Sequence, residues 1–265
     1  MKKVSLCLIL KNDCHKTIYS FERSGFKIIE KKSEFIIKDA PKEYIKVIDN
    51  VEIELLVAYS DTTDKRLIDY FTPIASQIIY VENKDGIVGS TSDAQMYNSL
   101  LSIASNEFIC LFKPIVFFQT HWLTELIYYY ETVGKSGIIS IPSNFSDVEF
   151  LPLSTPDNES FVNVFIPKEK LIKPNNTLFF LKEYLYVVGA LDESVLFTDG
   201  DELIQLQLRY IALGYINYYI PNQSCLIIDN PKTFSANAST SKSNISTTLA
   251  DMKKAKTYYI PLKNI

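Results

Sequence analysis

The sequence contains little glycine, little histidine and no long uninterrupted apolar run. Only 8 of its 265 residues are glycine and 2 are histidine. Loops that hold a phosphate through glycine backbone N–H groups are therefore scarce. His15 and His121 are too far apart in the chain to form a recognisable metal-binding spacing. No segment reaches the roughly 18 apolar residues that a membrane-spanning helix needs.

The cysteines and the charges exclude further classes of protein. The four cysteines are scattered and no CxxC pair occurs, which argues against a zinc site and a disulfide framework. With 27 Lys and Arg against 31 Asp and Glu, the net charge is −4, so the basic surface of a duplex nucleic-acid binder is missing. The apolar run at 4–10 is followed by Lys11, Asn12 and Asp13 instead of a signal-peptide cleavage site. We expect a reduced, cytoplasmic protein without a nucleic-acid partner.

Apolar residues are nonetheless abundant, at 47% of the chain, and they fall into short runs. Continuous runs of this length are typical of strands that are covered on both faces, and they occur at 4–10, 53–58, 78–81 and 108–112. Helical spacing of apolar residues is found at 64–71, with Thr62 or Thr63 as the cap, and at 93–104. The alternation predicts an α/β protein with a mostly parallel central sheet.

The remaining segments complete the predicted organisation. Turns between short strands within 16–50 indicate a small antiparallel addition. Further helices are expected at 123–130 and 202–213, and further strands at 137–141, 215–220 and 224–228. Residues 142–176 are expected to form loops with short strands. We expect one domain over 1–230, followed by a polar linker and tail over 231–265.

Three segments carry motifs in a recognisable order. Residues 4–12 read V-S-L-C-L-I-L-K-N, and residues 83–112 place Asn98, Ala104 and Glu107 at motif positions. The third segment combines G-A-L-D-E-S-V-L-F at 189–197 with E-L-I-Q-L-Q-L-R at 202–209. Together they resemble the family 2 glycosyltransferases, whose motifs include V-S-x-I-I-P-x-Y-N, G-x-F-D-E-x-F-F and E-D-x-D-L-x-x-R.

This resemblance implies the A-type glycosyltransferase fold, with a nucleotide-binding half over 1–112 and an acceptor half over 113–230. It implies transfer of a sugar from a nucleotide-sugar donor to a polysaccharide or glycoconjugate, with inversion, in a bacterial surface or capsule pathway. The acceptor would be a glycan or a lipid-linked glycan. Lys253, Lys254 and Lys256 in the tail either contact an anionic membrane or form a solvated helix end.

The chain departs from the family where the family binds its metal. A D-x-D after the fourth strand holds Mn²⁺ or Mg²⁺ there, because hard cations prefer carboxylate oxygens. Here the strand is followed by Lys113-Pro114-Ile115, so the ligands of the expected divalent metal are absent. Lys113 either replaces the cation as a phosphate ligand or is a solvated lysine at the end of a strand.

The resemblance places six residues on the donor side: Leu10, Asn12, Tyr59, Asp61, Asp93 and Lys113. The family's V-D-N-G-S-T-D is matched by V-A-Y-S-D-T-T-D at 57–64, in which Ala58 replaces the first acid. Asp61 or Asp64 substitutes for that acid, or Asp61 caps the helix that follows. Tyr59 either stacks on the nucleotide base or packs within the loop.

Three acids are candidates for the catalytic base: Asp199, Asp201 and Glu202. Glu202 matches the first acid of the family's E-D-x-D motif, while Leu203 and Gln205 replace the other two. The same acids also suit the start of a helix, where they stabilise its dipole. The acceptor side is expected to contain Trp122, Asp192 and Glu193, of which the last two match the family's D-E turn.

Two functions remain open after these comparisons of residues. One is an active glycosyltransferase, and the other is an inactive relative that binds a sugar, a nucleotide or a partner protein as a scaffold. The missing D-x-D and the altered base-binding segment favour the second. A nucleotidyltransferase would need a Gly-rich basic loop after the first strand, and residues 12–16 do not supply one.

Overall fold

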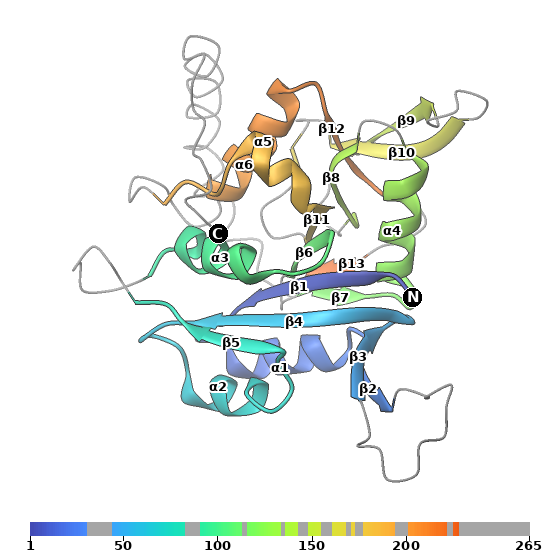
Figure 1. Cartoon of the computed structure of the whole chain (residues 1–265). Helices are drawn as coiled ribbons and strands as arrows, with labels where there is room; N and C mark the ends of the chain where they lie inside the picture. Colours follow the sequence, from blue (N-terminus) through green and yellow to red (C-terminus); the bar gives the residue numbers. More distant parts are fainter. Residues whose placement is uncertain are drawn as a thin grey trace.

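The computed structural model describes residues 1–30, 44–82, 91–112, 116–133, 136–142, 148–154, 161–167, 171–172, 177–193, 201–221 and 225–227 (Figure 1). Its strands are β1 (Lys3–Ile9), β2 (Lys27–Glu30), β3 (Tyr44–Ile48), β4 (Val51–Tyr59), β5 (Gln77–Tyr80), β6 (Phe108–Phe112), β7 (Val116–Phe118), β8 (Ser136–Ser140), β9 (Val148–Ser154), β10 (Phe161–Pro167), β11 (Leu178–Leu181), β12 (Ile216–Tyr219) and β13 (Cys225–Ile227). Its α-helices are α1 (Cys14–Glu22), α2 (Lys65–Phe71), α3 (Asp93–Ile103), α4 (Trp122–Thr132), α5 (Leu185–Val188) and α6 (Asp201–Ala212).

The main sheet has eleven strands and a largely parallel centre. Its order is β2-β3-β4-β1-β6-β11-β8-β12-β10-β9, and β5 also pairs with β4. The pairs β5–β4, β4–β1, β1–β6 and β8–β12 are parallel, whereas β11 runs antiparallel between β6 and β8. β7 and β13 form a separate two-stranded sheet. The predicted α/β class with a mostly parallel central sheet is confirmed.

Burial on both faces explains the continuous apolar runs. Along β1, Leu6 and Leu8 belong to a core cluster shared with α1, α2 and α4, whereas Cys7 and Ile9 belong to a second cluster shared with α3, α5 and α6. Successive side chains of a strand point to opposite faces, so a strand covered twice needs apolar residues at nearly every position. Figure 1 shows α1 and α2 on one side of the sheet and α3 on the other.

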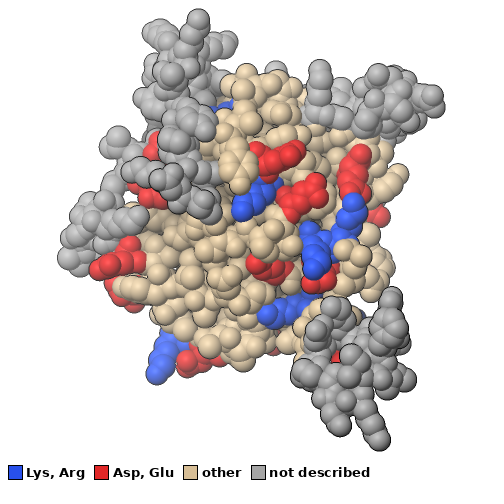
Figure 2. All heavy atoms as spheres, viewed as in Figure 1, with Lys and Arg blue, Asp and Glu red and all other residues tan. Residues whose placement is uncertain are grey.

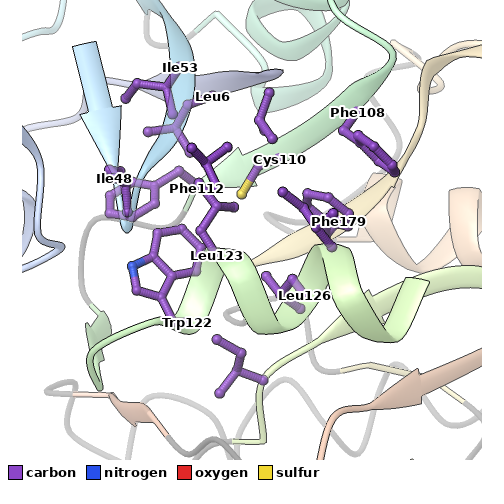
Figure 3. Packing of buried hydrophobic residues seen from close by; sticks show 14 of the residues in the cluster. Leu6, Ile48, Ile53, Phe108, Cys110, Phe112, Trp122, Leu123, Leu126 and Phe179 are labelled. Atoms are coloured by element: carbon purple, nitrogen blue, oxygen red, sulfur yellow. The ribbon is translucent and has the colours of Figure 1, made fainter. Parts of the chain in front are cut away.

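Aromatic side chains fill the first of these clusters (Figure 3). The ring of Trp122 stacks on Phe118 with centroids 4.2 Å apart, and Phe112 lies edge-on to Phe21 at 6.0 Å. The indole N–H of Trp122 donates a hydrogen bond to the carbonyl of Ser24 at 2.9 Å. The large rings bury much apolar area while the single polar N–H remains paired, which is the stable way to bury a tryptophan.

The structure corrects the expected start of α2. Its N-cap is Asp64, whose carboxylate accepts from the backbone N–H of Arg66 at 2.9 Å, so neither Thr62, Thr63 nor Asp61 caps the helix. Hydrogen bonds from Arg66 lower the pKa of Asp64 to about 2. Thr63 instead donates its hydroxyl to the carbonyl of Leu10 at 3.1 Å, which ties the loop after β4 to the loop after β1.

Residues 16–50 contain both an expected and an unexpected element. The antiparallel addition is present as β2 and β3, whereas its second expected strand, at 35–37, lies outside the described residues. The first part of the segment is the helix α1, which was not predicted. Its buried face includes Thr17 and Ser20 beside Cys14 and Phe21. These four buried residues have helical spacing, but two of them have polar side chains, so the apolar periodicity that would predict the helix is weak.

Three cysteines pack as free thiols, as expected for two of them. Cys7, Cys14 and Cys110 are buried and free. Burial raises the pKa of the Cys7 and Cys110 thiols, which keeps them protonated within the core. Among the residues that the structure describes, no helix is both long and apolar enough to span a membrane.

Candidate functional site

The carboxyl ends of the parallel strands β1, β4 and β5 meet at one edge of the sheet. The register pairs Ile9 of β1 with Ala58 of β4, and Tyr59 of β4 with Tyr80 of β5. In open α/β sheets, ligands bind in the crevice beyond these ends. The polar side chains that follow the three strands therefore define the candidate site.

An ion pair joins the loop after β1 to the start of α3. Lys11 Nζ lies 2.9 Å from Asp93 Oδ2, and Asp93 is 8% exposed while Lys11 is 49% exposed. Asp93 is the first residue of α3, which opens with a capping box between Ser92 and Gln95. A carboxylate at a helix N-terminus is stabilised by the helix dipole. Lys11, which motif comparison did not single out, thus places a cation at the expected donor side.

Leu10 and Asn12 flank this cation in different ways. The backbone N–H of Leu10 donates to the carbonyl of Ala58 at 2.8 Å, and its side chain is 1% exposed. A ligand at this edge would therefore meet the backbone of the Leu10 segment and not its side chain. Asn12 is exposed two residues later.

An aromatic pair forms the side of the site next to β5. The rings of Tyr59 and Tyr80 are 5.6 Å apart at 55°, because parallel partners in register place their side chains on the same face. Tyr80 donates its hydroxyl to Asp61 Oδ1 at 2.7 Å, and this hydrogen bond raises the pKa of Tyr80 to about 12. Tyr80 is the third residue of the apolar run at 78–81, and the sequence around it carries no signal of its contact with Asp61.

The segment at 190–193 carries Asp192 and Glu193 and is held by side chains from two helices. From α3, Asn98 contacts both Leu191 and Glu193, and from α6, Arg209 donates to the carbonyl of Ala190 at 2.7 Å. Burial lowers the pKa of Arg209 to about 10, while the charge of Asp192 opposes that change. The guanidinium stays protonated at neutral pH.

The candidate catalytic acids are only partly within the described chain. Asp201 and Glu202 begin α6, whereas Asp199 and Lys113 lie outside the described residues. Leu203, which stands where the family has an acid, is completely buried. A fully buried leucine offers no proton acceptor, so any base must come from another position.

Trp122 lies apart from the other acceptor-side residues. It belongs to the core cluster with α1, α2 and α4, on the sheet face opposite α3 and Leu191. With 1% exposure and its N–H bound to Ser24, it has no surface for direct contact with a ligand. The structure thus groups Asp192 and Glu193 but does not bring Trp122 to them.

The described residues at this edge do not fit a divalent metal. Asp93 is paired with Lys11 and Asp61 accepts from Tyr80. Within the described ranges there is no group of three or more His, Cys, Asp or Glu that could hold an ion. Hard cations need several oxygen ligands, which the described residues at this edge do not offer.

A shallow hollow elsewhere in the molecule is not part of this site. It is lined by Glu107, Tyr130, Glu131 and Tyr184 among others. Glu107 directly precedes β6, so this hollow lies at the amino end of that strand, opposite to the candidate site.

Figure 2 shows one face of the molecule on which acidic and basic side chains are interspersed and not separated by sign.

Comparison with known proteins gives matches among solved structures alone, since no family model and no curated protein matches the chain. Residues 1–349 of S. aureus TarS match with a TM-score of 0.52 at 13% identity, over 88% of this chain and 62% of that one. The same TarS fragment in complex with UDP-GlcNAc matches with a TM-score of 0.50 at 12% identity, over 87% and 60%. The mannosyltransferase PcManGT of Pyrobaculum calidifontis, in complex with GDP-Man and Mn²⁺, gives 0.49 at 14% identity, over 86% and 57%.

The chain has a glycosyltransferase fold. At this low identity the likeness concerns the fold, and activity has to be argued from the site. The chain spans less than two thirds of the length of the TarS fragment that it matches. The glycosyltransferase fold implied by the motifs is therefore confirmed, while the assignment to family 2 stays a resemblance.

Proposed function

We propose that the chain binds a nucleotide-sugar donor at the carboxyl ends of β1, β4 and β5 and transfers the sugar to a hydroxyl of a polysaccharide or glycoconjugate. The observation that carries this proposal is the convergence of Lys11, Asp61 and the Tyr59–Tyr80 pair at that edge of a glycosyltransferase fold. TarS, which shares the fold, was crystallised with UDP-GlcNAc.

The aromatic pair and Asp61 are suited to the nucleoside. A tyrosine face is apolar and polarisable, so it stacks on a base, while the carboxylate of Asp61 accepts hydrogen bonds from base or ribose. The backbone of Leu10 and the side chain of Asn12 would border the ribose, since they follow β1 directly. In this proposal residues 1–112 bind the donor and 113–230 bind the acceptor.

The leaving diphosphate needs positive charge in the absence of metal ligands. Lys11 supplies one cation at the edge, and Lys113, directly after β6 in the sequence, supplies the second. An ammonium binds phosphate as a point charge and needs no divalent ion. Asp93 would then hold Lys11 in place.

Transfer also needs a proton acceptor for the incoming hydroxyl. The acids available on the acceptor side are Asp192, Glu193, Asp199, Asp201 and Glu202. A carboxylate within hydrogen-bond reach of the hydroxyl acts as general base while the diphosphate leaves. A lipid-linked acceptor would lie at a membrane, which the lysines of the tail would contact.

Isothermal titration with UDP-GlcNAc, GDP-mannose, UDP and uridine tests donor binding, with and without EDTA. We expect binding of a diphosphate donor that EDTA does not change. Lys113→Ala should weaken the diphosphate ligands by roughly 10- to 150-fold, the equivalent of about 1.5–3 kcal/mol, and leave uridine unchanged. Loss of binding on addition of EDTA, or an unchanged affinity of the alanine variant, contradicts the role of Lys113. No binding of any donor contradicts the proposal as a whole.

Binding without turnover is the second candidate function. It is favoured by the complete burial of Leu203 and by the sequence Lys113-Pro114-Ile115 in place of carboxylates. A chain that binds a donor tightly but neither hydrolyses it nor transfers its sugar would support a scaffold or sensor. Measurement of released UDP separates the two functions.

A further inference from the structure

Asn98 makes a three-point contact with the segment that carries Asp192 and Glu193. Its amide nitrogen donates to the carbonyl of Leu191 at 2.8 Å and to Glu193 Oε1 at 2.8 Å. Its amide oxygen accepts from the backbone N–H of Leu191 at 2.9 Å. Nearly all the hydrogen-bonding capacity of one side chain is thus spent on a segment 93–95 residues further along the chain.

Arg209 braces the same segment from the other side. It is 7% exposed and donates to the carbonyl of Ala190 at 2.7 Å. The neighbouring charge of Asp192 acts on its guanidinium. The segment begins after Gly189, whose φ of 81° is a conformation that residues other than glycine rarely adopt. Asn98 on α3 and Arg209 on α6 therefore hold a sharply turned segment between two helices.

Glu193 keeps accepting capacity in this arrangement. An ionised carboxylate has about four acceptor positions, and the hydrogen bond from Asn98 uses one of them, on Oε1. Oε2 has no partner among the described residues, and Glu193 is half-buried and not deeply enclosed. The helix α3, whose Asn98 contacts Glu193, packs on β1 and β4. It begins at Asp93, which pairs with Lys11 at the carboxyl ends of the strands.

We propose that Asn98 and Arg209 are positioning residues that fix segment 190–193 so that Oε2 of Glu193 accepts the hydroxyl of the incoming acceptor. The inference rests on the proposed function and names Glu193 as the proton acceptor. The acceptor oxygen bonds to the anomeric carbon as the bond to the diphosphate breaks. Its proton passes to Glu193, and the bonding electrons leave with the diphosphate.

The test uses the full chain and UDP-GlcNAc, with water as the acceptor and released UDP as the readout. Glu193→Gln removes the carboxylate, and Asn98→Ala removes the contact that directs it. Each variant should slow UDP release by at least about 10-fold and change the dissociation constant of UDP-GlcNAc by less than about 2-fold, because misplacement of a reacting group affects the rate and not donor binding. Ser99→Ala is the matched control, since Ser99 lies next to Asn98 and its hydroxyl donates to the carbonyl of Gln95 within α3, at 2.9 Å.

Exchanging the amide of Asn98 and the carboxylate of Glu193 separates an effect on the rate from an effect on stability. Asn98→Asp loses both donors and sets a second carboxylate against Glu193, which should lower the thermal midpoint. In the double variant N98D/E193Q an amide again faces a carboxylate, so the midpoint should return toward wild type while UDP release stays slow. If Glu193 had a purely structural role, the rate of UDP release would recover together with the thermal midpoint. Recovery of the midpoint alone supports the role of Glu193 as proton acceptor.

Each result decides the inference. If the wild-type chain releases UDP and either Asn98→Ala or Glu193→Gln releases it at the same rate, the positioning role is overturned and the proposed function stands. Failure of wild type to bind UDP-GlcNAc or to release UDP overturns the positioning role together with the transferase activity. In that case a restored midpoint in the double variant assigns the contact to stability.

Discussion

The two ends of the parallel strands carry carboxylates in opposite states. At the amino end, Glu54 accepts from the hydroxyl of Ser5 at 2.6 Å, from the backbone and hydroxyl of Ser105 at 2.9 Å each, and from the amide of Asn106 at 3.4 Å. Beyond the carboxyl end, Asp61 accepts from Tyr80, and in the segment at 190–193 Glu193 accepts from Asn98. The same chemical group is saturated at one end of the sheet and keeps capacity at the other.

This difference separates structure from chemistry within one sheet. A carboxylate whose oxygens are filled by protein donors is a satisfied polar group and stabilises the fold. A carboxylate that keeps unfilled acceptor positions at the ligand-binding edge can bind a substrate without breaking a network. Substitutions at the amino end should therefore change stability, whereas substitutions of Asp61 or Lys11 at the carboxyl end should change donor binding and those of Glu193 should change the rate of transfer.

The largest effect is expected for Glu54→Ala at the amino end. The variant leaves the donors of Ser5, Ser105 and Asn106 without their acceptor, which should lower the free energy of unfolding by about 3 kcal/mol. Urea denaturation measures the loss, and titration of UDP-GlcNAc should show an unchanged affinity for the folded protein. Glu52→Ala is the control, because its partner Lys3 is well exposed and the pair should contribute less than about 1 kcal/mol. Equal effects of the two variants would contradict the structural role of the Glu54 network.

The next effect compares two lysines at the two ends of β1. Lys3 pairs with Glu52 at 3.1 Å at its start, and Lys11 pairs with Asp93 at 2.9 Å beyond its end. Lys11→Ala should weaken a diphosphate donor about tenfold, or about 1.4 kcal/mol, because it removes a cation and leaves the Asp93 charge facing the phosphates. Lys3→Ala should leave donor affinity unchanged. Calorimetric titration of the diphosphate donor measures the affinity of each variant. Equal losses of affinity in Lys11→Ala and Lys3→Ala would contradict the distinction between the two ends of the sheet.

The smallest effect concerns the titration of Tyr80. Its pKa, raised to about 12 by the hydrogen bond to Asp61, should fall toward about 10 in Asp61→Asn, since the amide no longer carries a charge. The folded-state pKa lies above the unfolded value, so the stabilising contact is complete below pH about 10 and is lost as the pH rises toward about 12. Ultraviolet difference absorbance of tyrosinate, with Tyr80→Phe as the reference, follows the change. An unaltered titration in Asp61→Asn would show that the two groups do not interact in solution.

Several elements were predictable because their signal is local. The runs at 4–10 and 108–112 predicted β1 and β6 to within one residue, since a strand buried on both faces must be apolar throughout. The helix α6 was equally visible at 202–213, with Leu203, Leu206 and Tyr210 on its buried stripe. The helix α1 was missed because Thr17 and Ser20 occupy half of its buried face.

The candidate site was predictable in part. Motif positions led to Tyr59, Asp61, Asp93 and the Asp192–Glu193 pair, all of which lie within the described chain. Lys11 and Tyr80 were not identified as their partners, because nothing in the neighbouring sequence marks these two residues. Arg209 matches the arginine of the family's E-D-x-D-L-x-x-R motif, but the motif does not show which residue it contacts. The roles assigned to Asp199 and Lys113 remain predictions, since both lie outside the described residues.

The alternation of strands and helices, and through it the α/β class, can be derived from the amino-acid order alone, because burial imposes a period on neighbouring residues along the chain. Which polar groups contact one another follows only from the three-dimensional arrangement of these elements. Tyr80 and Asp61 are 19 residues apart, and Asn98 and Glu193 are 95 apart. A hydrogen bond depends on distance in space, and that distance is set by strand order and helix packing, neither of which leaves a periodic trace in the sequence.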